Sequence, residues 1–341
     1  MNVTDSGESY WATDDIETVV HCPVCGSVDF VHAYSDLVDT EEGVPGLWSM
    51  KSCRQCSSLI LDPRPVPHAL HKAYRTYYTH RAPEGENAVL SGGGFVGATL
   101  RTYLRQRFGW NGSPGIGLTR AVIGCIPPVR HQLAYFMRHL PNTPGRLLDV
   151  GCGNGAFMLR AKQAGWHVEG VEPDRVAAAV ARESTGAPVY DSFSDLPSRS
   201  FDQVTLSHVI EHLHEPTQVL ERCSQVLKPG GRIWLATPNI NGKGHRYFRR
   251  AWQPLETPRH LSMPSATGLQ MMLNQAGFSN IRFRPRGRGS RKRIEASSLR
   301  ISSDPPSGAA RLLLSQWIDF VGSFSSMGAE ELVLTAEVSA R

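Results

Sequence analysis

The alternation of short apolar runs with amphipathic segments after residue 145 is the feature that most constrains the fold of this chain. Seven stretches read as strands, namely "RLLDV", "WHVEGVEP", "PVYD", "FDQVTLSHVI", "RIWLATPN", "SNIRFRP" and "EELVLTAEV". Segments at helical spacing separate most of them, and this alternation indicates a parallel sheet covered on both faces. We therefore predict an α/β fold with a doubly wound, seven-stranded, mostly parallel sheet over residues 145–341.

The remainder of the chain divides where its composition changes. We expect a disordered tail over 1–18, a small module with paired cysteines over 19–65, and a helical linker or cap region over 66–144. A long irregular insertion at 238–265 interrupts the α/β part, and loops of that length in compact domains usually serve function. The N-terminus has no basic and apolar leader, and no run approaches the roughly 18 apolar residues of a membrane span. These features favour a cytoplasmic protein.

A glycine-rich loop follows the first strand of the α/β part. "LLDVGCGNGAF" places Gly151, Gly153 and Gly155 between a strand and a helix, where the backbone can approach a ligand closely. Glu172 ends the next strand, a position that suits two ribose hydroxyls. Asp149 precedes the loop and would repel a pyrophosphate, whereas it suits a cationic ligand. The pattern therefore favours S-adenosylmethionine over a dinucleotide.

An ordered set of motifs in this region resembles the class I S-adenosylmethionine-dependent methyltransferases of the bacterial small-molecule and sugar group. The set is "LDVGCGNG", "EPD", "FDQVTLSHVIEHL", "LKPGG" and "ATPN". The resemblance implies a Rossmann-like methyltransferase sheet whose last strand is antiparallel. It also implies a cofactor site, made of Asp149, Gly151, Cys152, Gly153, Gly155, Glu172, Pro173, Ser192, Phe193, Ser207 and His208. Within that site, Glu172 would bind the ribose and Ser192 with Phe193 would flank the adenine.

Four cysteines fall into two CxxC pairs. They are Cys22 with Cys25 in "CPVC" and Cys53 with Cys56 in "CRQC". Each CxxC turn supplies two thiolates to a tetrahedral zinc, so the spacing predicts a zinc-ribbon-like module. Because cysteines fill all four positions, we expect the zinc to be structural. A redox pair is the alternative, although redox chemistry does not need a second CxxC pair.

Histidines and glutamates cluster in "SHVIEHLHEP". His208, Glu211 and His212 share one face of a helical turn, and His260 of the later insertion is expected to join them on the acceptor side. Three interpretations stay open: a base for the acceptor, a divalent metal site, or side chains that brace the turn and line the cofactor. A histidine at the first position weakens a magnesium site, since that ion prefers oxygen ligands. His214 is expected to be solvated.

Charge and apolar patches bear on partners. The formal net charge of +5 is modest, and acids outnumber bases in the module over residues 19–56, so nucleic acid is an unfavourable partner. The basic run over 282–293 would hold an anionic acceptor or form exposed loop charges. The apolar pieces "TRAVIGCIPP" and "RLLLSQWIDFVGSF" would pack or touch a membrane surface peripherally.

We therefore predict methyl transfer from S-adenosylmethionine to a small-molecule acceptor. The resemblance favours a hydroxyl of a sugar, including a nucleotide- or lipid-linked sugar, in glycan or secondary-metabolite synthesis. An RNA methyltransferase that binds RNA through the zinc ribbon is one alternative, and a non-catalytic S-adenosylmethionine-binding protein is another.

Overall fold

A seven-stranded sheet forms the centre of the molecule. The computed structural model of the chain describes residues 10–74, 80–83, 95–110, 119–301 and 305–339. In spatial order the strands are β12 (Phe278–Arg284), β13 (Glu331–Val338), β10 (Leu227–Pro238), β9 (Phe201–Ser207), β6 (Arg146–Val150), β7 (His167–Val171) and β8 (Val189–Tyr190). Only β13 runs antiparallel to its neighbours. This order confirms the predicted doubly wound, mostly parallel sheet with an antiparallel last strand.

Both faces of the sheet are buried, since most residues of its central strands are buried. Leu147 and Leu148 point to opposite faces of β6, and both are fully buried in separate core clusters. One face carries α7 (Pro216–Val226) and α9 (Ala266–Gln275). The other face carries helices α2 (Phe95–Phe108), α3 (Thr119–Gly124), α4 (Pro127–Phe136), α5 (Ala156–Gln163) and α6 (Arg175–Thr185).

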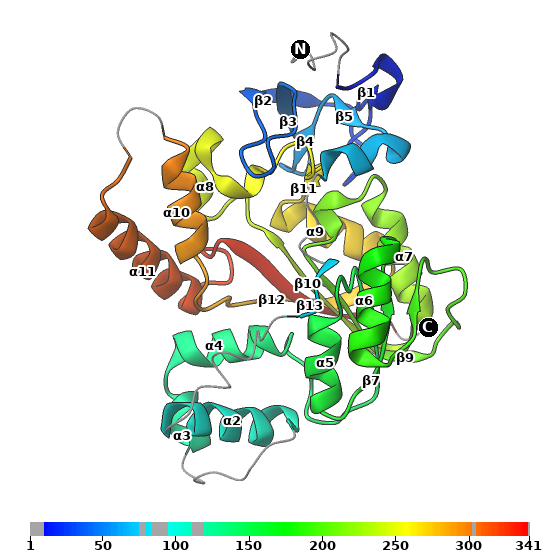
Figure 1. Cartoon of the computed structure of the whole chain (residues 1–341), viewed down its shortest axis with the longest axis vertical. Helices are drawn as coiled ribbons and strands as arrows, with labels where there is room; N and C mark the ends of the chain where they lie inside the picture. The colour runs from blue at the N-terminus through cyan, green and yellow to red at the C-terminus, as the bar shows by residue number, and fades with distance from the viewer. Residues whose placement is uncertain (1–9, 75–79, 84–94, 111–118, 302–304, 340–341) are drawn as a thin grey trace.

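Helices α2, α3 and α4 occupy the region predicted to be a helical cap. Figure 1 shows them together below the sheet, at the end of the molecule opposite the N-terminal module. Residues 84–94 and 111–118, on either side of α2 in the sequence, lie outside the described residues. Among the described residues, no helix combines the length and apolar character needed to cross a bilayer.

The N-terminal module is a second, smaller sheet above α9 (Figure 1). Its strands are, in spatial order, β11 (Ser262–Met263), β4 (Leu59–Leu61), β3 (Trp48–Cys53) and β2 (Phe30–Leu37). The edge strand β11 comes from the insertion after β10, so the module is completed by a segment far along the chain. The 3₁₀-helix η2 (Pro67–Ala73) follows β5 in the sequence.

Residues 10–18 belong to the folded module, unlike the disordered tail predicted for 1–18. They form η1 (Thr13–Asp15) and β1 (Ile16–Glu17), which pairs with β5 (Arg64–Pro65). Trp11 is buried, and its ring meets that of Trp48 edge-on at 5.3 Å between centroids. Aromatic burial therefore anchors a segment that its polar composition had marked as disordered. Residues 1–9 lie outside the described residues.

The predicted insertion over 238–265 is folded, not irregular throughout. It contains α8 (Lys243–Phe248), η5 (Arg249–Ala251), η6 (Gln253–Leu255) and the strand β11. Its Arg259 forms a buried two-pronged ion pair with Asp39 of the module, at 2.8 and 2.7 Å between nitrogen and oxygen. Two further helices, α10 (Arg291–Leu299) and α11 (Gly308–Phe324), pack beside the insertion.

Candidate functional site

The glycine loop turns between β6 and α5 at the carboxyl edge of the sheet. The backbone at Gly151, Gly153 and Gly155 has φ values of +66°, +53° and +82°. Residues other than glycine rarely adopt this left-handed region. A Cβ at Gly151 would lie 2.5 Å from Cγ2 of Val209, inside "SHVIEHLHEP". Glycine therefore lets the loop and the histidine-rich segment touch. Cys152 is buried in this loop.

Glu172 lies against the glycine loop, at the end of β7. Its Oε2 accepts the backbone N–H of Gly153 at 2.8 Å, and its Oε1 accepts that of Asp174 at 3.1 Å. Each oxygen retains a second lone pair that can accept another hydrogen bond. Burial raises the pKa of Glu172. Pro173, which follows, is exposed.

Asp149 is fully buried beneath the loop, and only one of its two carboxylate oxygens has a hydrogen-bond partner in the described part of the chain. Its Oδ1 pairs with the Arg138 guanidinium and accepts the Thr205 hydroxyl at 2.8 Å. Its Oδ2 is buried without a hydrogen-bond partner among the described residues. Burial raises the pKa of Asp149, although the nearby Arg138 opposes that change. A buried carboxylate oxygen without a donor is a strong acceptor for a positively charged group.

The remaining predicted cofactor residues also lie at the carboxyl edge of the sheet. Ser207 is the last residue of β9, beside Ala236 of β10. Ser192 and Phe193 follow β8; the Ser192 side chain is exposed, and Phe193 packs partly into the core. The carboxyl ends of parallel strands meet at one edge, which explains why residues distant in sequence gather there.

His208 lies between two buried carboxylates. Its Nδ1 is 3.1 Å from Oε1 of Glu211, and its Nε2 is 2.7 Å from Oε1 of Glu331. Burial lowers the pKa of His208, but these two hydrogen bonds outweigh burial and raise it well above its ordinary value. For Glu211, burial alone would raise the pKa, but the hydrogen bond with His208 and the charge of His208 lower it to about 2. His208 is therefore an imidazolium at neutral pH, which cannot accept a proton.

His212 is held by a backbone carbonyl and a tyrosine. Its Nδ1 is 3.1 Å from the carbonyl oxygen of Arg259 and 3.1 Å from the Tyr74 hydroxyl. Because a carbonyl only accepts, Nδ1 carries the proton and Nε2 keeps a lone pair. Burial lowers the pKa of His212 to about 4, and the neighbouring His260 adds to the effect. His212 is thus neutral at physiological pH.

His260 meets His212, as the sequence predicted. The two rings cross nearly edge-on with centroids 4.7 Å apart. The Nδ1 of His260 donates to the Pro254 carbonyl at 2.7 Å, and its Nε2 lies 3.6 Å from Oε2 of Glu256. One ligand atom each from Glu211, His212 and His260 lies within 4.8 Å of the others. This trio, hereafter the Glu-His-His cluster, combines one carboxylate with two imidazoles.

Part of the basic run over 282–293 is buried and neutralised, unlike either prediction for it. Glu331 at the start of β13 pairs with Arg286 and, at 2.6 Å, with Arg293. The Arg286 guanidinium also lies 3.3 Å from the ring centroid of Tyr135. Because burying an arginine requires a partner charge, these two arginines are structural and not free to bind an anionic acceptor.

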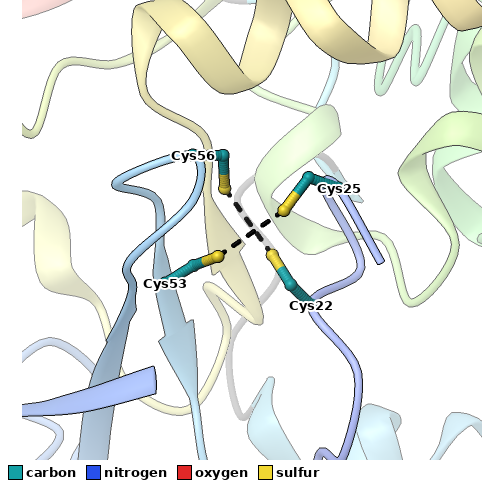
Figure 2. Close-up of side chains that lie close together, drawn as sticks. All are labelled: Cys22, Cys25, Cys53 and Cys56. Carbon is teal, nitrogen blue, oxygen red and sulfur yellow. Dashed lines mark hydrogen bonds between the residues drawn. The ribbon is translucent and has the colours of Figure 1, made fainter. Parts of the chain in front are cut away.

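The four predicted zinc cysteines converge, with sulfurs that point toward one centre (Figure 2). The Sγ atoms of Cys22 and Cys56 are 3.7 Å apart, and those of Cys25 and Cys53 are 3.5 Å apart. Tetrahedral zinc with bonds of about 2.3 Å separates its sulfurs by about 3.8 Å, so the residues fit that ion. Four cysteines leave no position open for chemistry.

The module is tied to the α/β part at several points. Ser265, which caps α9, donates its hydroxyl to the Cys56 carbonyl. His214, expected to be solvated, donates instead from Nε2 to the Pro65 carbonyl at 2.8 Å. Cys22, Cys56 and residues of β9 and α9 share one core cluster. The four-cysteine site therefore lies against the α/β fold and not on a separate lobe.

Sequence reasoning missed several residues that contact the site. Arg138, Tyr74 and Glu331 come from the cap region, from the residue after η2 and from the last strand. For Arg138 and Tyr74, no motif or spacing marks the residue. Two adjacent acids at the start of the apolar run "EELVLTAEV" were a usable signal, because a glutamate in a buried strand requires a partner.

Comparisons with known proteins found a matching family, related sequences and similar solved structures. The family described as "Methyltransferase domain" matches residues 127–282. The chain is 31% identical to the ubiquinone biosynthesis O-methyltransferase of Idiomarina loihiensis, over 46% of this chain and 70% of that protein. It is 33% identical to the same-named protein of Pseudomonas aeruginosa, over 30% of this chain and 48% of that protein. A solved S-adenosylmethionine-dependent methyltransferase from Archaeoglobus fulgidus aligns with 20% identity and a TM-score of 0.41, over 64% of this chain and 93% of that one.

The chain belongs to the class I S-adenosylmethionine-dependent methyltransferases. Its methyl donor is accordingly S-adenosylmethionine, and the residues around the glycine loop fit that cofactor because Asp149 offers an unpartnered oxygen to a cation. Apart from the first relative, the chain spans about half the length of the relatives it matches. The matched family region does not include the four cysteines.

Proposed function

We propose that this enzyme transfers a methyl group from S-adenosylmethionine to a hydroxyl oxygen of a small-molecule acceptor. The observation that carries the proposal is the Glu-His-His cluster beside the glycine loop, with ligand atoms of two imidazoles and a carboxylate within 4.8 Å of one another. A hydroxyl acceptor must lose its proton as the oxygen attacks the sulfonium methyl. Groups that receive or stabilise that proton are therefore needed exactly where the acceptor approaches.

The cofactor would lie across the carboxyl edge of the sheet. Asp149 would accept its ammonium group with Oδ2, and Glu172 would accept the ribose hydroxyls with its remaining lone pairs. The other proposed contacts are Gly151, Cys152, Gly153, Gly155, Pro173, Ser192, Phe193, Ser207 and His208. Contact between Gly151 and Val209 would then bring the sulfonium side of the cofactor next to the cluster.

In this proposal His212 accepts the proton of the acceptor hydroxyl, and His260 lies beside it. His208 is already protonated, so it serves as a fixed positive charge that holds Glu211 ionised. The Nδ1 proton of His212 is oriented by the Arg259 carbonyl, and its Nε2 is left to accept the hydroxyl proton. Ionised Glu211 then stabilises the imidazolium that forms.

A divalent cation is the second candidate for the same task. Glu211, His212 and His260 would hold it, and each imidazole already has its Nδ1 fixed by a carbonyl, as metal-binding histidines usually do. Such an ion would lower the pKa of the acceptor hydroxyl. Two imidazoles suit zinc or a transition metal better than magnesium.

The acceptor class follows from resemblance and relatives. A sugar hydroxyl in glycan or secondary-metabolite synthesis, including a nucleotide- or lipid-linked sugar, is the acceptor that the bacterial group implies. The matched relatives are named for ubiquinone biosynthesis, which favours a phenolic hydroxyl as second candidate. An RNA acceptor is disfavoured by the acidic module, and simple cofactor binding without turnover is the remaining alternative.

The test measures S-adenosylhomocysteine formation with a panel of nucleotide-sugars and substituted phenols. We expect His212→Gln to lower turnover by about a hundredfold or more while cofactor affinity, measured by calorimetry, stays unchanged. Glu172→Ala should instead weaken cofactor binding. His214→Gln is the matched control, since His214 also bonds a backbone carbonyl but lies outside the cluster. Activity that survives His212→Gln would refute the assignment of the base.

Chelation separates the two forms of the mechanism. Dialysis against a chelator should leave turnover intact if His212 accepts the proton alone, and should abolish it if a cation is required. Restoration by added zinc, manganese or magnesium then identifies the ion. The four-cysteine zinc is monitored by metal analysis in the same samples, so that loss of the structural ion is not mistaken for loss of the other.

A further inference from the structure

One side of α11 presents large apolar side chains to solvent. Leu313, Trp317, Phe320 and Phe324 recur at positions i, i+4, i+7 and i+11, so they lie on one side of the helix. Their exposed fractions are 67%, 49%, 60% and 62%. Figure 1 shows α11 at the outer edge of the molecule. The opposite side, which includes Ile318, is buried against the fold. We call the four exposed side chains the α11 face.

The α11 face is a continuous patch and not a set of isolated residues. The rings of Phe320 and Phe324 are 5.0 Å apart. Met327, just beyond the helix, is exposed as well. Single exposed apolar residues are ordinary on protein surfaces, whereas contiguous aromatic patches mark sites of interaction. The fold therefore presents an apolar surface that something else is expected to cover.

Basic side chains border this surface. The Lys243 ammonium lies 5.5 Å from the ring centroid of Trp317, so the start of α8 adjoins the α11 face. Arg246 and the exposed Tyr247 follow by three and four residues, hence on the same side of α8 as Lys243. Together, α8 and η5 contain four Lys and Arg residues and no acid. Arg291 on α10 is exposed too.

Charge distinguishes between the occupants of such a surface. A second copy of the chain, docked face to face, would bring the same basic border against this one and be repelled. A bilayer that contains anionic phospholipid accepts both parts, because aromatic side chains enter the interface while Lys and Arg pair with the headgroups. We propose that the α11 face, with its basic border on α8, binds an anionic membrane surface.

The α11 face is connected through β13 to the acceptor side of the sheet. From α11 the chain runs through residues 325–330 into β13 at Glu331, which bonds His208. Glu331 pairs with Pro238, where β10 ends on the acceptor side of the sheet. Membrane contact through α11 would thus place the acceptor side of the enzyme near the bilayer and near apolar acceptors dissolved in it. Binding itself does not depend on the proposed methyl transfer, since it is measured without turnover.

The experiment is co-sedimentation of the full chain, zinc bound, with two kinds of vesicle. One is pure phosphatidylcholine, and the other is phosphatidylcholine with an equal part of phosphatidylglycerol. We expect binding to the anionic vesicles that weakens as salt is added. Phe320→Ser with Phe324→Ser should reduce the partition constant by at least about tenfold. Arg246→Gln should reduce it by about fivefold.

Val28→Ser with Val176→Ser is the matched control, because both valines are exposed but lie away from α11. It should leave the partition constant unchanged while circular dichroism confirms that both double variants are folded. Equal binding by the parent and the Phe320/Phe324 double variant would overturn the proposal. So would a dimer in sedimentation velocity that this double variant converts to monomer, since a second copy would then cover the face.

Discussion

Removal of the buried carboxylate of Asp39 should destabilise this protein far more than removal of an exposed one. Arg259 contacts both oxygens of Asp39 at 2.7 and 2.8 Å, and their side chains are only 5% and 0% exposed. Asp39→Ala leaves the guanidinium buried without a counter-charge. Breaking such a pair from one side costs about 3–5 kcal/mol in the free energy of unfolding.

The matched control is Asp29→Ala, in the same module. Asp29 pairs with Arg54 at 3.3 Å, but both side chains are about two-thirds exposed. Exposed pairs contribute about 0–1 kcal/mol, so this variant should unfold close to the parent. Urea titration of the zinc-bound chains at neutral pH measures both free energies of unfolding. Equal losses for the two variants would refute the reasoning from burial.

Lowering the pH should remove the stabilisation that the Asp39–Arg259 pair gives the parent protein. Burial raises the pKa of Asp39, but the hydrogen bonds from Arg259 and Val44 outweigh it, so the folded pKa lies below the ordinary value. A carboxyl with a depressed folded pKa stabilises the protein above its unfolded pKa, and that stabilisation is lost as pH falls through the folded value. The difference in the free energy of unfolding between the parent and Asp39→Ala should therefore become smaller as pH falls below about 4.

Three further outcomes test the zinc site, the His208 environment and the glycine loop. Metal analysis should find one zinc per chain at the four-cysteine site, lost in Cys56→Ser together with a lower melting temperature. Glu331→Gln should lower the pKa of His208 in an NMR titration, because one of its two carboxylate partners becomes neutral; an unchanged pKa would contradict the assigned contact. Gly155→Ala should cost more stability than Gly186→Ala, since both have positive φ but only the first would bring a Cβ within 2.7 Å of helix α6.

Local patterns predicted the main sheet well because its strands are buried on both faces. Four of the five residues of β6 are buried, and the helices beside it follow from helical spacing, so short-range sequence carries the α/β architecture. The meeting of His212 with His260 was also predictable, because both follow strands whose carboxyl ends share one edge. That geometry does not depend on details of the loops.

Long-range partners escaped prediction for a physical reason. Whether Glu331 is a surface acid or the buried partner of His208 depends on how β13 pairs, and no short stretch records that pairing. The prediction for Arg286, in the basic run over 282–293, was wrong for the same reason. The sequence alone marks Arg286 as a surface residue, because it does not show that Glu331 lies beside it. Tyr74 reaches His212 only because the module and the insertion fold together.

The strand β11 has a consequence for how the protein is made. Ser262 and Met263 complete the four-stranded sheet of the module, whose other three strands lie before residue 62. On the ribosome the four cysteines emerge early and can capture their metal, yet the sheet around them stays open along β4 until the insertion follows. The part of the enzyme that is synthesised first is thus finished late. Truncated chains that end before β11 would expose an unpaired strand and are expected to aggregate or be degraded.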